Sequence, residues 1–319
     1  MKVSGSYFFN ATENKNETSL ARTYFTGGDS LQIYKENSSR ISKNMNHRAN
    51  LRMEYDIDSM NRIIFTPRVS FQHNESNRLQ QANTRDQDSA LINSTSNTNT
   101  TDNNGMSFGG NLTYNHKFAK KGRAVSVNLS SNINTREGDG SLMSNNQYND
   151  TLGLPVTDIT DQRYDLTSFT NTYSANVTYT EPVSEKAQVM ANYAPSISNS
   201  ESDRQTKTPD GNGEYTVLAT DLSNKFNNTY NTQRGGLSYR YNDQKVMVNL
   251  GANYQQAILD GESEFPQVYS VNKTFSNILP TAMINYRFSR TQNLRFMYRT
   301  NTNAPSISQL QNVPDITDP

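Results

Sequence analysis

The chain has 319 residues, no cysteine and no tryptophan, and only 33% of its residues are hydrophobic. Its 30 basic residues balance 30 acidic residues, so the formal net charge is zero. This balance argues against a nucleic-acid partner, and the lack of cysteine excludes disulfides, thiolate metal sites and cysteine nucleophiles. No apolar stretch approaches the ~20 residues that a membrane-spanning helix needs, which excludes a helical membrane protein.

Apolar and polar residues alternate with period two in the N-terminal part of the chain. A less regular hairpin is predicted from residues 3–9 and 20–25. A regular hairpin follows, in which residues 49–55 enter a turn around Asp58 and residues 63–71 leave it. Alternation of this kind is typical of a strand with one apolar and one polar face.

The clearest alternation lies between residues 106 and 133. Phe108, Leu112 and Tyr114 alternate with polar residues up to a basic turn around Lys121, after which Val125 and Leu129 resume the pattern. We therefore predict a long antiparallel hairpin here. Three further hairpins are predicted around later turns, with centres at Ser184, Gln244 and Arg290.

Long polar segments rich in Asn, Ser, Thr, Asp and Gly separate the hairpins, at residues 74–104, 136–165 and 199–225. Disordered chains are poor in aromatic residues, whereas this chain has 18 Tyr and 13 Phe. Long strands, short turns and long polar loops in strict alternation are typical of an outer-membrane barrel. We therefore predict an all-β, antiparallel transmembrane β-barrel of the outer-membrane type, with about 12 strands.

Three prolines fall within the predicted strands, at positions 67, 195 and 280. A proline cannot donate to the ladder of a sheet and is normally found at an edge or a bulge. We expect β-bulges at these positions.

The polar faces of the predicted strands carry several charged residues. If Leu51, Met53 and Phe65 face lipid, the residues between them point into the lumen. The guanidinium group of arginine pairs bidentately with carboxylates, so inward arginines can contact a plug or an anionic solute. A solvated wall of Arg and Glu pairs is the alternative. The lumen-facing candidates are Arg48, Arg52, Glu54, Arg62, Arg68, Arg295 and Arg299.

Chemical motifs are sparse. His47, His73 and His116 are far apart in the sequence and show none of the paired spacings of zinc or triad sites, so we expect neither an enzyme nor a metal centre. Residues 210–214 (Asp-Gly-Asn-Gly-Glu) resemble part of a calcium loop without its distal glutamate, which favours a turn and leaves calcium as an alternative. No cofactor is expected.

Two stretches resemble the outer-membrane β-barrel family of Bacteroidetes, whose members enclose a plug in TonB-dependent receptors. The first comprises Asn46-His47-Arg48, residues 54–58 (Glu-Tyr-Asp-Ile-Asp) and Pro67. The second comprises Leu279-Pro280 and residues 286–289, 293–295, 298–300 and 304–311. The specific motifs cover a small part of the chain, whereas the layout covers most of it.

The resemblance implies a barrel of about 22 strands, an internal plug domain, and uptake of a large nutrient powered through the TonB complex. The chain shows no segment like a plug, no TonB box and no terminal aromatic strand. Residues 1–319 are therefore expected to form a single β-barrel region, the central part of such a receptor in the bacterial outer membrane. Outer-membrane lipid, the plug domain and TonB are the expected partners.

Two other classes of function remain open at this point. A plugless porin or secretion barrel has the same alternation of short turns and long loops. An extracellular adhesin built of soluble β hairpins also fits the polar composition.

Overall fold

The computed structural model describes residues 1–25, 31–150 and 152–303. The described residues form one antiparallel 12-stranded sheet in which the strands lie side by side in chain order, except for one short strand off this path. The first six strands are β1 (Lys2–Phe25), β2 (Leu31–Asp56), β3 (Asn61–Asp86), β4 (Leu91–Lys117), β5 (Ala124–Asn149) and β6 (Pro155–Pro182). The sheet continues with β7 (Ala187–Thr208), β9 (Asn224–Asn242), β10 (Val246–Phe265), β11 (Tyr269–Arg287) and β12 (Asn293–Arg299).

Two small elements interrupt the passage from β7 to β9. The short strand β8 (Val217–Leu218) pairs with the end of β7, and a 3-10 helix, η1 (Thr220–Leu222), follows it. Among the described residues, no helix has the length and the hydropathy to cross a lipid bilayer. The all-β class predicted from the alternation is confirmed.

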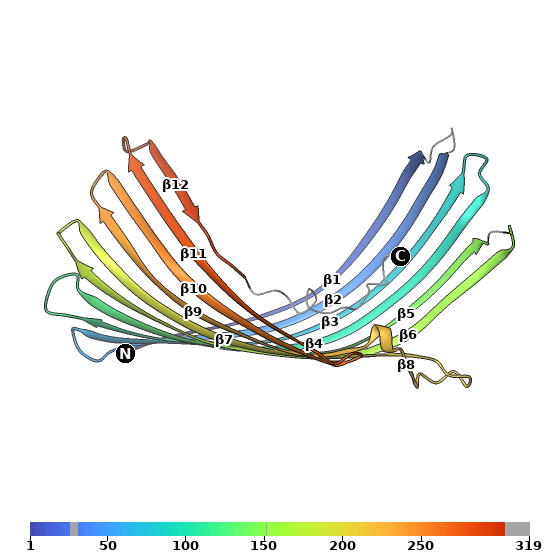
Figure 1. Cartoon of the computed structure of the whole chain (residues 1–319), viewed down its shortest axis with the longest axis horizontal. Helices are drawn as coiled ribbons and strands as arrows, with labels where there is room; N and C mark the ends of the chain where they lie inside the picture. Colours follow the sequence, from blue (N-terminus) through green and yellow to red (C-terminus); the bar gives the residue numbers. More distant parts are fainter. Residues whose placement is uncertain (26–30, 151, 304–319) are drawn as a thin grey trace.

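The sheet is strongly curved and open. Figure 1 shows it as a trough whose two arms rise from a narrow centre. Among the described strands, β1 and β12 lie at the two edges and each pairs with one neighbour. The five predicted short turns lie between β2 and β3, β4 and β5, β6 and β7, β9 and β10, and β11 and β12, all at one end of the sheet (Figure 1).

Most of the long polar segments are strands, which corrects the prediction of loops for residues 74–104 and 136–165. In residues 199–225 the prediction holds in part, because β7 ends at Thr208 and a loop that includes β8 and η1 leads to β9 at Asn224. β3 runs to Asp86 and β4 begins at Leu91, so a tight turn replaces the expected loop. Each of the two strands has 26 or 27 residues, whereas ~9–11 residues suffice to cross a bilayer. The ladder therefore continues well beyond the lipid.

Polar side chains hold these extensions together across neighbouring strands. Thr100 Oγ1 lies 2.6 Å from Ser141 Oγ, and Thr95 Oγ1 donates to Asn146 Oδ1 at 2.8 Å. Such cross-strand pairs stabilise a sheet that has no apolar face. Asn, Ser and Thr also favour turns, which is why their abundance in the sequence predicts loops here.

The N-terminal hairpin and the bulges are further corrections. Residues 2–25 form one continuous strand, β1, paired with β2 along its whole length, because both segments share one register. At Pro67 the β2–β3 pairs on either side keep the same register, and Pro67 itself lies opposite Gly110 of β4. Pro195 and Pro280 are also in continuous register. Each proline forgoes a ladder bond without inserting a residue.

Candidate functional site: the inner face of the sheet

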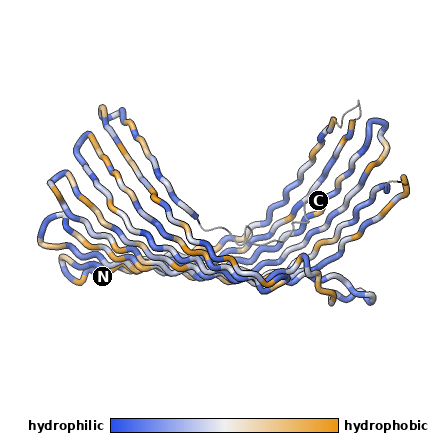
Figure 2. Tube along the Cα trace, in the orientation of Figure 1, coloured by the Kyte–Doolittle hydropathy of each residue, from blue (hydrophilic) through white to orange (hydrophobic). Residues whose placement is uncertain are grey.

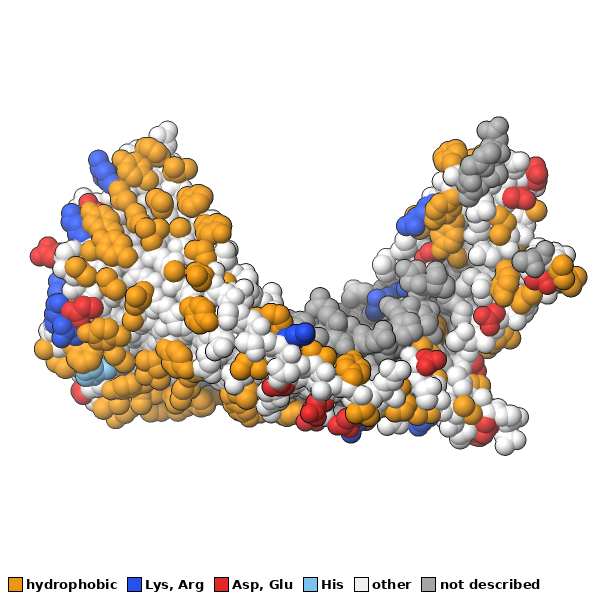
Figure 3. All heavy atoms as spheres, in the orientation of Figure 1, with side chains coloured by type: hydrophobic (Ala, Val, Ile, Leu, Met, Phe, Trp, Pro, Cys, Tyr) orange, Lys and Arg blue, Asp and Glu red, His pale blue; other side chains and the backbone are white. Residues whose placement is uncertain are grey.

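The strand registers place every apolar position of the predicted pattern on one face. One row of directly opposed residues runs across six strands from Val3 through Met53, Phe65, Leu112 and Leu129 to Ala175. Figure 2 shows hydrophobic and hydrophilic residues alternating along the strands near the short turns. Figure 3 shows the apolar side chains gathered over the arm that carries these turns. We call this face the outer face and the opposite one the inner face.

Burial shows that the inner face is the concave one. Inner-face residues such as Asn97, Leu142, Gln162 and Phe226 are buried without any partner layer, whereas large outer-face residues such as Leu129 are exposed. The side chains of a curved sheet crowd together on its concave side. The predicted assignment of the polar face to the inside therefore agrees with the curvature.

Three of the predicted lumen-facing residues form one ion-pair group on the inner face. Arg52 Nε lies 2.6 Å from Glu54 Oε1, and Arg62 donates a hydrogen bond to the other carboxylate oxygen of Glu54. Arg62 Nε also lies 3.6 Å from Asp56 Oδ1. These residues neutralise one another, which is the paired wall that the sequence left as an alternative.

Arg48 and Arg68 differ from this group, because neither has an ion-pair partner among the described residues. They are diagonal neighbours on β2 and β3, since Arg48 lies opposite Ser70 and Arg68 lies opposite Asn50. Both are exposed on the inner face. A Cβ atom at Gly109 would lie 3.0 Å from Arg68 Nε, so the glycine makes room for the guanidinium group.

Arg295 and Arg299 lie on the inner face of the edge strand β12. They are opposite Asn285 and Thr281 of β11, and both are exposed. The predicted candidates are therefore not brought together in one place. Residues 304–311, which contributed to the family resemblance, lie outside the described residues.

Several inner-face arginines were not among the predicted candidates, because they lie in segments that are predicted as loops or, for Arg40, outside the predicted strands. They are Arg40, Arg78, Arg136 and Arg204. On the outer face of the same extensions lie Glu75, Asp102, Glu137, Asp139, Asp165, Glu201 and Asp203. Cations such as Lys43, Arg163 and Lys207 also lie on this outer face, and Glu36 lies on the inner face, so the two faces differ in their excess of one sign and the charges are not fully separated. Continuing the period-two alternation of the strands through these extensions would have assigned the charged residues to their faces.

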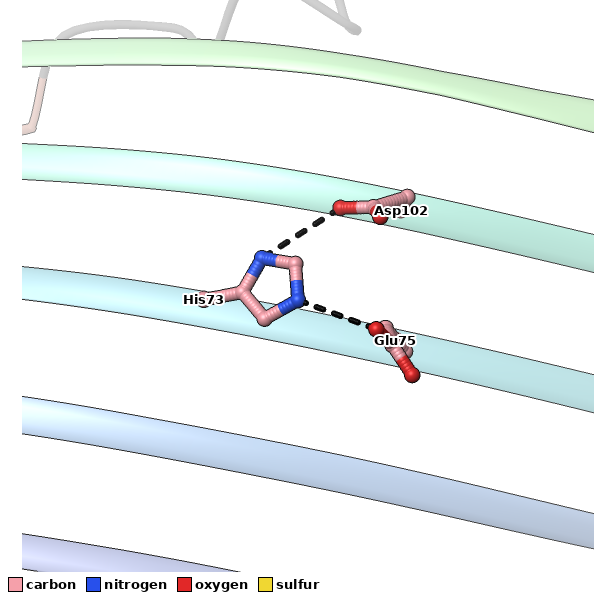
Figure 4. A group of neighbouring side chains, drawn as sticks. All are labelled: His73, Glu75 and Asp102. Atoms are coloured by element: carbon pink, nitrogen blue, oxygen red, sulfur yellow. Dashed lines mark hydrogen bonds and ion pairs between the residues drawn. The ribbon is translucent and has the colours of Figure 1, made fainter.

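A histidine and two carboxylates meet on the outer face, just beyond the last apolar pair, Phe71 and Met106. His73 Nε2 lies 3.2 Å from Glu75 Oε1, and His73 Nδ1 lies 3.4 Å from Asp102 Oδ1 (Figure 4). The carboxylates flank opposite ring nitrogens, an arrangement that stabilises a protonated imidazole. The three groups also place ligand atoms within 4.8 Å of one another. The prediction of isolated histidines missed this group because strand pairing creates it.

The loop after β7 uses its acidic residue for turn formation. Asp210 Oδ1 accepts hydrogen bonds from the backbone N–H groups of Asn212 and Glu214 at 2.8 and 3.1 Å. These bonds hold the pKa of Asp210 below its usual value. Gly213 has φ +86°, which favours glycine. Turn chemistry therefore accounts for the residues that resembled a calcium loop.

The outer membrane protein beta-barrel family matches residues 116–319, nearly two thirds of the chain. The chain belongs to this family. It is accordingly an antiparallel β-barrel protein of the bacterial outer membrane, and its apolar outer face contacts membrane lipid. No curated protein matches the chain.

Solved structures of outer-membrane proteins resemble the chain at low identity. FpvA of P. aeruginosa bound to a pyoverdine is 12% identical with a TM-score of 0.49, over 91% of this chain and 40% of that one. The siderophore receptor PiuA of Acinetobacter baumannii is 8% identical with a TM-score of 0.35, over 89% and 48%. The Escherichia coli protease OmpT is 12% identical with a TM-score of 0.27, over 90% and 96%. The chain spans less than half the length of the two receptors.

Proposed function

We propose that residues 1–319 are the central part of a TonB-dependent receptor of the Bacteroidetes type, and form part of the wall of a conduit for a large nutrient. The motifs around residues 46–67 and 279–300 support this assignment, because they resemble that family within the broader barrel family. The full barrel would have about 22 strands, as is usual for plugged outer-membrane transporters.

The open sheet is the observation that carries the proposal. β1 has 24 residues, and among the described residues its far edge has no partner strand. Each unpaired backbone group in lipid costs several kcal/mol, so a spanning sheet must close on itself. Further strands joined to the β1 and β12 edges would close the sheet with a lumen wide enough for a plug and a large solute.

The inner face supports a transport role without catalysis. Among the described residues, Arg48 and Arg68 have no ion-pair partner, and we propose that their guanidinium groups contact the plug or the solute in the lumen. All three histidines lie on the outer face: His47 opposite Phe71, His73 opposite Asn104 and His116 opposite Asn61. The residues most often used for acid–base catalysis therefore face away from the lumen.

A photocrosslinking residue on each face tests the proposal in the intact protein. Asn50 is an exposed inner-face residue of β2, two residues from Arg48 and directly opposite Arg68. Leu51 is its exposed chain neighbour on the outer face. With benzoylphenylalanine at position 50, we expect crosslinked peptides that join β2 to a plug segment of the same polypeptide. The same residue at position 51 should give none. Absence of a plug crosslink from position 50 would favour a plugless porin.

A further inference from the structure

Two arginines lie directly opposite each other on the inner face of the long hairpins. Arg40 of β2 pairs with Arg78 of β3, eight residue pairs beyond Arg48 and Ser70. Like charges at directly opposed positions of a sheet destabilise it. The regular rows of apolar outer-face residues on these strands end at Met45 and Phe71, and beyond them only isolated residues such as Ile41 and Leu79 are apolar. The arginine pair therefore lies in the part of the sheet that extends past the lipid.

The protein neutralises this pair only weakly. Arg40 Nε donates to Ser76 Oγ at 2.9 Å, and Ser76 is buried. Arg78 Nη2 lies 3.8 Å from Glu36 Oε1, which is too long for a hydrogen bond. Tyr34 donates to the other oxygen of Glu36 at 2.7 Å. Among the described residues, no other carboxylate pairs with either arginine.

The residues that flank the pair in the same row are polar and uncharged. Asn16 of β1 lies opposite Arg40, and Asn99 of β4 lies opposite Arg78, so the two arginines form the centre of a row of four residues. Most N–H groups of the two guanidinium groups have no acceptor within the described part of the chain. Each guanidinium group presents a planar fork of donors that matches a carboxylate or a phosphate.

We propose that Arg40 and Arg78 form the recognition site for the anionic groups of the transported solute, carboxylate or phosphate. This inference rests on the proposed function and adds the chemical class of the solute. An anion between the two arginines removes the repulsion between them and satisfies their free donors. The site lies on the inner face above the lipid, where a solute from outside the cell first meets the conduit.

Calorimetric titration of the purified intact protein in detergent tests this site. The probes are tricarballylate for carboxylate and tripolyphosphate for phosphate, with maltotriose as an uncharged control. We expect at least one anion to bind with an affinity that falls as salt rises, and we expect maltotriose not to compete for the site. The double variant Arg40→Gln/Arg78→Gln should weaken binding at least tenfold.

Three further variants distinguish specific anion recognition from nonspecific electrostatic attraction and from misfolding. Lys43→Gln removes a cation from the outer face of β2 and should leave binding unchanged. Glu36→Gln removes the one nearby carboxylate and should tighten binding. Arg40→Lys/Arg78→Lys keeps the charge and loses the forks, so its affinity should lie between those of the wild type and the glutamine variant. Heat-modifiable electrophoretic mobility checks that each variant is folded.

Two results would overturn the inference. One is that neither anion binds the wild-type protein. The other is that folded Arg40→Gln/Arg78→Gln binds both anions as tightly as the wild type. Either result leaves the proposed function standing if position 50 still crosslinks to a plug. Conversely, anion binding without any plug crosslink would support the anion site and contradict the assignment as a TonB-dependent receptor.

Discussion

Leu112 of β4 lies directly opposite Leu129 of β5 on the outer face, whereas its chain neighbour Asn111 lies opposite Ser130 on the inner face. Two residues that are adjacent in the sequence therefore lie on opposite faces of the sheet. Arginine on the lipid face costs ~2–4 kcal/mol near the bilayer midplane, and the lumen tolerates it. We expect Leu112→Arg to reduce the yield of inserted protein strongly and Asn111→Arg to leave it near the wild-type level. Equal yields would mean that the faces are assigned wrongly.

The topology is tested by cysteine labelling, since the native chain has no cysteine. Lys121 lies in a short turn and Asp88 in the tight turn at the opposite end of the sheet, and both are exposed. In outer-membrane barrels the short turns are periplasmic. A membrane-impermeant maleimide on intact cells should label Asp88→Cys and spare Lys121→Cys. Labelling of both positions would contradict this orientation.

The crowding of the inner face predicts different effects on stability for two glycine substitutions, one on each face. A Cβ atom at Gly140 would lie 2.7 Å from the backbone oxygen of Thr100 and 2.6 Å from the ring of Tyr164. At Gly110, on the outer face, the nearest atom would be 3.7 Å away. We expect Gly140→Ala to lower the free energy of unfolding by ~1–3 kcal/mol, as overpacking does. Gly110→Ala should change it little, as urea titration of the folded protein in lipid would measure.

The turn between β2 and β3 has a pH-dependent component. Asp58 Oδ1 accepts hydrogen bonds from the backbone of Met60 and Asn61 at 2.7 and 2.8 Å. The side chain of Asn61 and then the backbone of Met60 lower the pKa of Asp58. A carboxyl group with a lowered folded-state pKa stabilises the fold above its unfolded pKa of ~3.9, and loses that contribution as the pH falls through the folded value.

Hydrogen exchange measures this contribution. At pH 7 the turn amides of Asp58→Ala should exchange faster than those of the wild type, and Ser59→Ala should match the wild type. The difference between Asp58→Ala and the wild type should shrink below about pH 4. A difference that is constant with pH would show that the carboxylate does not hold the turn.

The sequence allowed the membrane-facing half of the fold to be predicted, and the reason is physical. Residues such as Phe108, Leu112 and Leu129 must face lipid, so the period-two pattern is strong wherever the bilayer requires it. Beyond the lipid both faces of the sheet are exposed to water. Asn, Ser and Thr fill the strands there, and no pattern distinguishes a long hairpin from a loop.

The same limit applies to the candidate site. Arg48, Arg52 and Arg68 were found because apolar neighbours fixed their parity. Arg40 and Arg78 were missed because Ile41 and Leu79 beside them are isolated apolar residues in polar segments, and the opposition of the two arginines depends on the β2–β3 register. The register is a property of paired strands and cannot be derived from either strand alone. The same holds for His73 and Asp102, which come from different strands.

The central claim is that this sheet is part of the wall of a larger plugged barrel. The most direct measurement is planar-bilayer recording with purified residues 1–319. We predict no discrete conductance steps, because the edges of β1 and β12 need further strands before the sheet can close. Stable, discrete steps of uniform size would show that these strands close by themselves. That result would contradict the receptor assignment and identify the protein as a porin.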